Sequence, residues 1–203
     1  METAVVDARA VSFQDVSTVA GSTSTISGTT SATAADVTIT TLPASGTARV
    51  LKKSNQMFVS GDQGAVAALL NLTAAQLATV GTKWISVTKT DAPFAAIAKS
   101  LTPVGLVHPF LSSTPTSTDL LATATSPAAT VISGPWHGDG ATNGWTGLTS
   151  LRIDPATSLP RSGLIELHHQ SSIATRAVVF SSWTAAIAIT VPTVSIAYES
   201  IAA

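Results

Sequence analysis

Short segments in which polar and β-branched apolar residues alternate recur along the chain, and turn-forming residues separate them. Asp36-Val-Thr-Ile-Thr-Thr41 is one such segment, and the serines and threonines around Ile26 fit the same pattern. Alternation is typical of a strand that buries one face, because successive side chains of a strand point to opposite sides. The pattern predicts strands over 21–31, 36–41, 49–53, 56–60, 83–88, 129–133, 146–153, 163–169, 175–181 and 186–191.

A few short helices are predicted between the early and the late strands. Ala65–Leu70 is a short apolar run, and Thr73-Ala-Ala-Gln76 has the spacing of a capping box, with Gly81 placed to end that helix. Asp91 is placed to cap a further helix, whose apolar face consists of Phe94, Ile97 and Leu101. Strands, then helices, then strands predict an α+β fold: a mostly antiparallel sheet with two or three short helices on one side.

The composition excludes several classes of function. Of 203 residues, 33 are Ala, 31 Thr and 25 Ser, whereas only 10% are charged, so hydroxyls form most of the polar surface. The net charge is −1 and the 10 Lys and Arg are not clustered, which argues against a nucleic-acid surface. The absence of cysteine excludes disulfides, thiolate nucleophiles and cysteine zinc sites. We expect one domain over 1–203, poorly ordered over 1–20, with Lys52-Lys53 as a solvated hairpin tip.

The start of the chain and its apolar runs bear on its location. No stretch of 18 uninterrupted apolar residues occurs, so we expect no membrane span. Met1–Ala4 lacks the basic start and the apolar region of a signal peptide. Either the protein is cytosolic or a targeting segment has been removed.

Four local patterns follow one another in a familiar order. Met57-Phe-Val-Ser-Gly-Asp62 ends a hairpin, and Val80–Val87 leads into the helix Pro93–Leu101. The third pattern is Leu151–Pro160, a strand and a turn, and the last is Val179–Thr184 followed by Ile187–Pro192. Together, over about residues 45–192, they resemble the actinobacterial cell-envelope lipoproteins of the LppX/LprAFG type.

This resemblance implies a strongly curved, mostly antiparallel sheet, a LolA-like half-barrel, with helices on its concave face and an apolar cavity between the two. It also implies an exported protein, anchored to the membrane through an acylated N-terminal cysteine, that binds or carries a lipid or glycolipid. The chain departs from the pattern because it has no lipobox cysteine and its first helix is short or missing. The missing cysteine is consistent with a soluble domain that lacks its signal peptide and anchor.

An apolar cavity between sheet and helices is the candidate site. Small Ala, Ser and Thr side chains fill space poorly, and a dry hollow prefers an acyl chain. The alternative is a closed core with no void. We expect the loop Pro103–Pro115 to gate the cavity. The candidate lining residues are Leu69, Leu70, Leu77, Ile97, Leu101, Leu106 and Phe110.

Other candidate chemistry has simpler interpretations. His168 and His169 are adjacent, so on a strand they point to opposite faces and cannot chelate one metal together, even with His137 and Asp139 nearby. The Gly134–Trp145 loop carries two tryptophans suited to stacking on a sugar or headgroup, but they are more simply a cover for the edge of the core. Glu166 and Asp154 show no pairing pattern for glycoside chemistry.

These observations predict a non-enzymatic domain of the cell envelope that binds a lipid or glycolipid, with no cofactor, no metal and no nucleic-acid partner. An envelope protein is a further expected partner. Two alternatives stay open. The first is a protein-interaction module of the same fold with a closed core. The second is a hydrolase without a recognisable motif, since no Gly-x-Ser-x-Gly elbow occurs.

Overall fold

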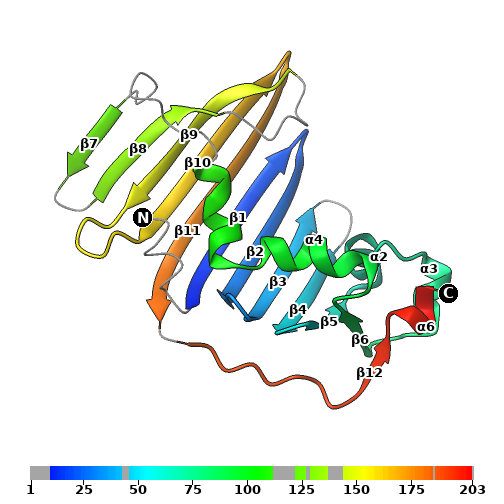
Figure 1. Cartoon of the computed structure of the whole chain (residues 1–203). Coiled ribbons are helices and arrows are strands. Elements are labelled where there is room, and N and C mark those ends of the chain that lie inside the picture. Colours follow the sequence, from blue (N-terminus) through cyan, green and yellow to red (C-terminus); the bar gives the residue numbers. More distant parts are fainter. Residues whose placement is uncertain are drawn as a thin grey trace.

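A single large sheet dominates the computed structural model, which describes residues 10–42, 46–111, 122–126, 129–136, 144–184 and 186–202 (Figure 1). Its twelve strands run in the order β12-β6-β5-β4-β3-β2-β1-β11-β10-β9-β8-β7, and every pair is antiparallel except β12 with β6. The strands are β1 Ala10–Val19, β2 Ser22–Ser31, β3 Ala34–Leu42, β4 Gly46–Lys53, β5 Gln56–Gly61, β6 Trp84–Thr88, β7 Ala122–Ser126, β8 Ala129–Pro135, β9 Thr146–Ile153, β10 Pro160–His169, β11 Ser172–Thr184 and β12 Ser195–Ala197. The helices are α2 Gln63–Leu70, α3 Ala74–Ala78, α4 Ala92–Ser100, α5 Pro103–Val107, the 3-10 helix η1 His108–Phe110, and α6 Glu199–Ala202.

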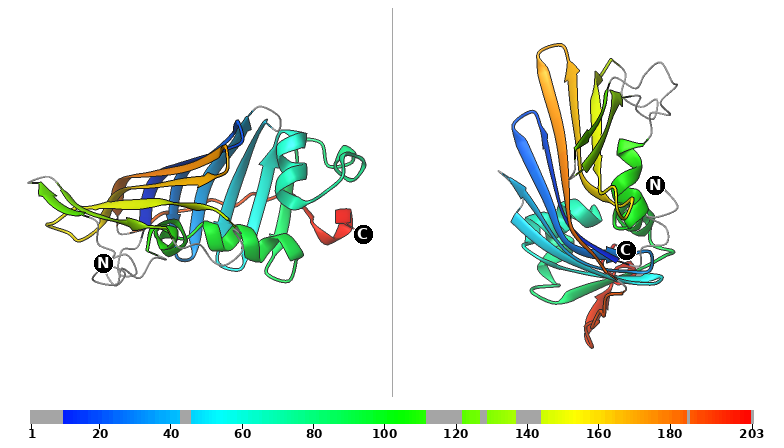
Figure 2. Two further views of the ribbon diagram at one scale, coloured as in Figure 1. Left: turned by 90° about the horizontal axis from the view of Figure 1, so that it is seen from above. Right: turned by 90° about the vertical axis from the view of Figure 1, so that its left-hand side faces the viewer.

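The predicted α+β class, the antiparallel sheet and the few short helices are confirmed, but the strong curvature is not. The sheet twists and stays open, with β12 and β7 at its two edges, and does not curl into a half-barrel (Figure 2). Curling needs bulges at repeated positions along a sheet. Among the described strand pairs, the register shifts only near Ser12/Phe13 and near Pro160/Ser162.

Apolar rows run straight across one face of the sheet, which we call the inner face. Phe13, Val37, Val50, Val59 and Ile85 stand opposite one another on successive strands, with Gly28 of β2 between Phe13 and Val37. All five side chains are buried, so this row forms the floor of the core. The alternation of the sequence therefore places apolar residues on one face, as it predicts.

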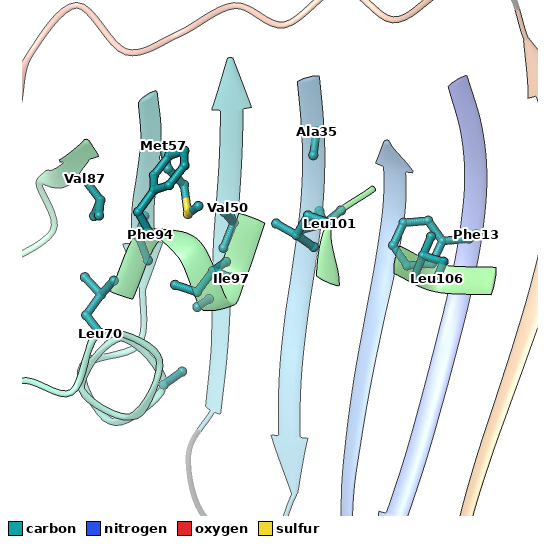
Figure 3. Close-up of a cluster of buried hydrophobic side chains, with 14 of the residues drawn as sticks. Phe13, Ala35, Val50, Met57, Leu70, Val87, Phe94, Ile97, Leu101 and Leu106 are labelled. Atoms are coloured by element: carbon teal, nitrogen blue, oxygen red, sulfur yellow. The ribbon is translucent and has the colours of Figure 1, made fainter. Parts of the chain in front are cut away.

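The helical strap, which we define as α4, α5 and η1 over residues 92–110, covers this inner face (Figures 1 and 3). Phe94 and Ile97 of α4 and Leu101 directly after it are buried together, which confirms the predicted face. The carbonyl oxygen of Leu101 accepts a 2.6 Å hydrogen bond from Thr30 Oγ1 of β2, so the strap is also tied to the sheet by a buried polar contact. The prediction of a loop over Pro103–Pro115 is wrong for residues 103–110, because these residues form α5 and η1. Residues 112–115 of the predicted loop lie outside the described residues.

Several local predictions are confirmed in detail. The capping box is complete: Gln76 N–H donates to Thr73 Oγ1, and Thr73 N–H donates to Gln76 Oε1. Ser54 has the positive φ that the predicted hairpin turn requires. Asp91 begins α4, yet its carboxylate accepts from the Thr88 N–H instead of capping the helix.

Residues 10–19 form the central strand β1, because the alternation of Val11, Phe13 and Asp15 buries one face, and residues 1–9 of the segment expected to be poorly ordered lie outside the described residues. Two further expectations are wrong. Residues 186–191 form no strand, because no neighbouring strand lies beside them in the described part of the chain. Lys52 is 5% exposed instead of solvated, because it belongs to the inner face between Ala35 and Met57, and its Nζ donates to the Ala32 carbonyl at 3.0 Å.

Gly28 should be essential to the floor of the core. A Cβ at this position would lie 2.1 Å from the Asp36 carbonyl oxygen, and the φ of +148° disfavours any L side chain. Gly28→Ala should therefore lower the free energy of unfolding by about 3–5 kcal/mol. Gly21→Ala also places a side chain at a positive φ, but nothing lies within 4 Å of the added Cβ. This variant should therefore lower the free energy of unfolding by only about 1–2 kcal/mol. Urea unfolding of both variants measures the difference, and equal costs would contradict the role of close backbone contact.

Lys52 should make folding stability depend on pH. Burial lowers the pKa of Lys52 from its ordinary value, so the folded protein releases this proton at a lower pH than the unfolded chain does. The contribution of Lys52 to stability therefore rises as the pH rises toward the pKa of an unfolded lysine, about 10.4. Relative to the parent, Lys52→Met should gain stability near neutral pH and lose that gain toward about pH 10.4. Lys53→Met, at the exposed neighbouring position of the same hairpin, is the matched control. A gain from Lys52→Met that does not shrink as the pH rises would disprove the argument.

Candidate functional site

A hollow lies between the inner face and two helices. It has a volume of about 400 Å³ and is bounded below by strands β2, β3 and β4 and above by α2 and α4. We call it the helix–sheet hollow. Its lining residues are Ser24, Ile26, Ile39, Thr41, Ala48, Ala65, Ala68, Leu69, Ala96, Ile97 and Ser100.

The floor and the rim of this hollow differ in chemistry. Ile26, Ile39 and Ala48 stand directly opposite one another on three neighbouring strands and form an apolar floor. One row further along the strands, Ser24 faces Thr41 and supplies hydroxyls. None of the lining side chains is ionisable, so the hollow offers an apolar surface with a neutral polar rim. Such a surface suits an apolar group with a polar end and provides no acid, base or metal ligand.

Small residues on the helices leave the space open. Ala65 and Ala68 of α2 and Ala96 of α4 face the floor where a leucine or phenylalanine would fill the gap. Ala65 is buried, whereas Ala68 and Ala96 are exposed, so small side chains at this place leave an open hollow between the helices and the sheet. The alanine-rich composition thus accounts for the open space between α2, α4 and the sheet.

The structure brings two of the seven predicted lining residues to this hollow, Leu69 and Ile97. Leu77 lines a second hollow of about 320 Å³ between α3, the start of α2 and strand β6. The other four, Leu70, Leu101, Leu106 and Phe110, are buried in the closed core. Sequence reasoning missed Ile26 and Ile39, although the alternating pattern of β2 and β3 already placed both on one face.

Phe110 closes the far end of the strap against the sheet. Its ring lies over Gly163 of β10, where a Cβ would come within 2.7 Å of two ring carbons. The Arg176 guanidinium also lies 5.6 Å from the ring centroid. Arg176 Nη2 in turn donates to Asp15 Oδ2 at 2.7 Å, and Asp15 is buried. Phe110 therefore sits in a socket made by a glycine and a paired arginine.

The remaining predicted sites are separate from the hollow. His168 Nε2 lies 2.9 Å from Glu166 Oε1 on the outer face, whereas His169 stacks on Trp145 at 5.4 Å, so the adjacent histidines diverge as expected. Trp136 packs against the core, while His137 and Asp139 lie outside the described residues. Asp154 pairs with Arg161 at 2.7 Å. Within the described residues, no three His, Asp or Glu side chains converge on a metal position, and no helix is long and apolar enough to cross a membrane.

Comparison with known proteins finds solved structures that are similar to this chain at low sequence identity. No family model and no curated protein matches this chain. The solved structure of the hypothetical protein CT021 from Chlamydia trachomatis is similar with a TM-score of 0.39 and 9% identity, covering 95% of this chain and 97% of that one. The crystal structure of MucB is similar with a TM-score of 0.35 and 14% identity, covering 98% of this chain and 60% of that one. The chain thus spans less than two thirds of MucB.

Proposed function

We propose that this chain is a non-enzymatic lipid-binding domain that holds an acyl chain of a lipid or glycolipid in the helix–sheet hollow. The observation that carries the proposal is the apolar floor of Ile26, Ile39 and Ala48 beneath alanine-rich helices. The volume of about 400 Å³ falls within the range of roughly 300–1,000 Å³ typical of ligand pockets. Each methylene buried there contributes about 0.8 kcal/mol, so a chain of several methylenes binds without any ionic contact.

The polar end of the ligand would remain at the rim. Ser24, Thr41 and Ser100 offer hydroxyls at the hollow and no charge, which favours a neutral or hydroxyl-rich headgroup over one that needs an ion pair. We also propose that the domain works outside the cytoplasm, in a cell envelope, with a lipid anchor outside this sequence. The ordered series of four lipoprotein-like segments supports that location.

A second candidate function rests on a different face. Leu148, Leu164 and Val179 are 57%, 45% and 52% exposed on the outer face of the sheet, diagonally adjacent across β9, β10 and β11. Exposed apolar side chains that adjoin one another are typical of protein-interaction surfaces. A protein-interaction module of this fold would therefore use the outer face and leave the hollow empty.

Filling the hollow should abolish lipid uptake. Ala96→Leu places a larger side chain in the hollow, whereas Ala95→Leu adds the same group at an exposed position of α4 that does not line the hollow. We expect the first variant to bind a fluorescent fatty acid at least about tenfold more weakly, the equivalent of losing about 1.4 kcal/mol, with the second unchanged. Fluorescence titration measures binding, and native mass spectrometry of the purified parent shows whether lipid co-purifies. A parent that takes up no fatty acid and carries no lipid contradicts the proposal.

The socket of Phe110 should control the rate of uptake, since the helical strap covers the apolar face beside the hollow. Gly163→Ala forces the Phe110 ring to move and loosens the end of the strap. We expect faster association and faster release of the fatty acid in stopped-flow fluorescence, with the affinity changed less than either rate. Ser162→Ala, on the opposite face of β10, should leave both rates unchanged. Unchanged rates in Gly163→Ala would show that the strap does not gate the hollow.

A further inference from the structure

A stretched linker joins the last long strand to the far edge of the sheet. Residues 186–194 leave β11 and run past the ends of β1 to β5 before β12 begins (Figure 1). They make no hydrogen bond to any other described residue. This segment is nevertheless rich in strand-forming residues, with Ile187, Ile189 and Val191 alternating with smaller side chains.

The linker is almost as long as it can be. β11 and β12 are separated by seven inter-strand spacings, which amount to about 34 Å at 4.8 Å each. The eleven residue steps from Thr184 to Ser195 span at most about 36–40 Å when fully extended. The chain therefore reaches its own edge strand only by giving up nearly all of its conformational freedom.

The C-terminal arm, which we define as residues 195–202, docks through specific contacts. Ser195, Ile196 and Ala197 pair in parallel with Trp84, Ile85 and Ser86. The Tyr198 N–H donates to the Ser86 carbonyl at 2.9 Å, and its hydroxyl donates to the Leu70 carbonyl at 3.4 Å. Ile201 is buried beside α3, so the arm completes the core at this end of the sheet.

We propose that two copies of this chain exchange their C-terminal arms, so that each copy docks its arm on strand β6 of the other. Exchange keeps every docking contact, because the same residues meet in the same register, and it releases the linker from the span across its own sheet. The two linkers, freed in this way, pair with each other in antiparallel fashion over 186–191. Pro192 ends that pairing because it has no N–H to donate.

The charges of the chain permit a second copy as the partner. The net charge is −1, so two copies repel each other weakly. No charged residue occurs between Arg176 and Glu199, so antiparallel linkers bring no like charges together. Each copy would then supply Tyr198 to the Leu70 carbonyl of its partner, one residue from Leu69 in the helix–sheet hollow.

Disulfide crosslinking between two differently marked copies tests the exchange directly. The chain has no cysteine, so Ser86→Cys in one copy and Ala197→Cys in another create a single opposed pair across β6 and β12. After the two variants are refolded together at high concentration and oxidised, we expect a covalent heterodimer on a non-reducing gel. Ser22→Cys in place of Ala197→Cys, at the exposed first residue of β2, is the matched control and should give none.

The double variant and the linker length provide independent readouts. Ser86→Cys with Ala197→Cys in one chain should give a covalent dimer; an internal disulfide in a monomer would overturn the proposal. Deleting Ile189–Val191 leaves a linker of at most about 26–29 Å, too short to span its own sheet, so light scattering should find dimers only. Inserting six Gly and Ser residues after Thr190 should weaken dimerisation at least tenfold. A monomeric deletion variant, or no heterodimer from the mixed copies, would exclude arm exchange.

Discussion

The inner face of the sheet imposes the main physical constraint on this protein. Its strands carry apolar rows that must leave water, and an open antiparallel sheet has no second sheet or barrel interior to cover them. The helical strap, α2 and the C-terminal arm perform that task with few residues. Burial of Met57 on β5 and of Leu70, Leu101 and Leu106 on the helical cover is the hydrophobic contribution on which the rest of the fold depends.

Covering a wide sheet with short helices explains both the hollow and the buried polar groups. Where α2 and α4 present alanine, the cover does not reach the floor and the helix–sheet hollow remains. Where polar groups lie under the cover, they find partners: Asp15 pairs with Arg176, and Thr30 reaches Leu101. Thr149 Oγ1 is an exception, buried without a hydrogen-bond partner among the described residues.

Local predictions succeed where the signal lies within a few residues. The capping box at Thr73, the hairpin turn at Ser54 and strand β9 over 146–153 each depend on neighbours in the chain. They fail where the outcome depends on distant partners. Residues 186–191 have a strand pattern but no neighbouring strand to pair with in the described part of the chain, and Lys52 has a polar side chain at a buried position of the inner face.

The sequence by itself determined the class of the fold: alternation specified which residues of each strand face the core, and the alanine-rich helices specified a thin cover. Only the tertiary structure decided which of those apolar residues border open space. Leu69 and Ile97 line the hollow while Leu101 and Leu106 lie in the closed core, because the packing of α4 and α2 against particular strands sets the gap between them. The span of the linker was likewise invisible in the chain order, since it depends on the spatial distance between β11 and β12 and not on their separation in sequence.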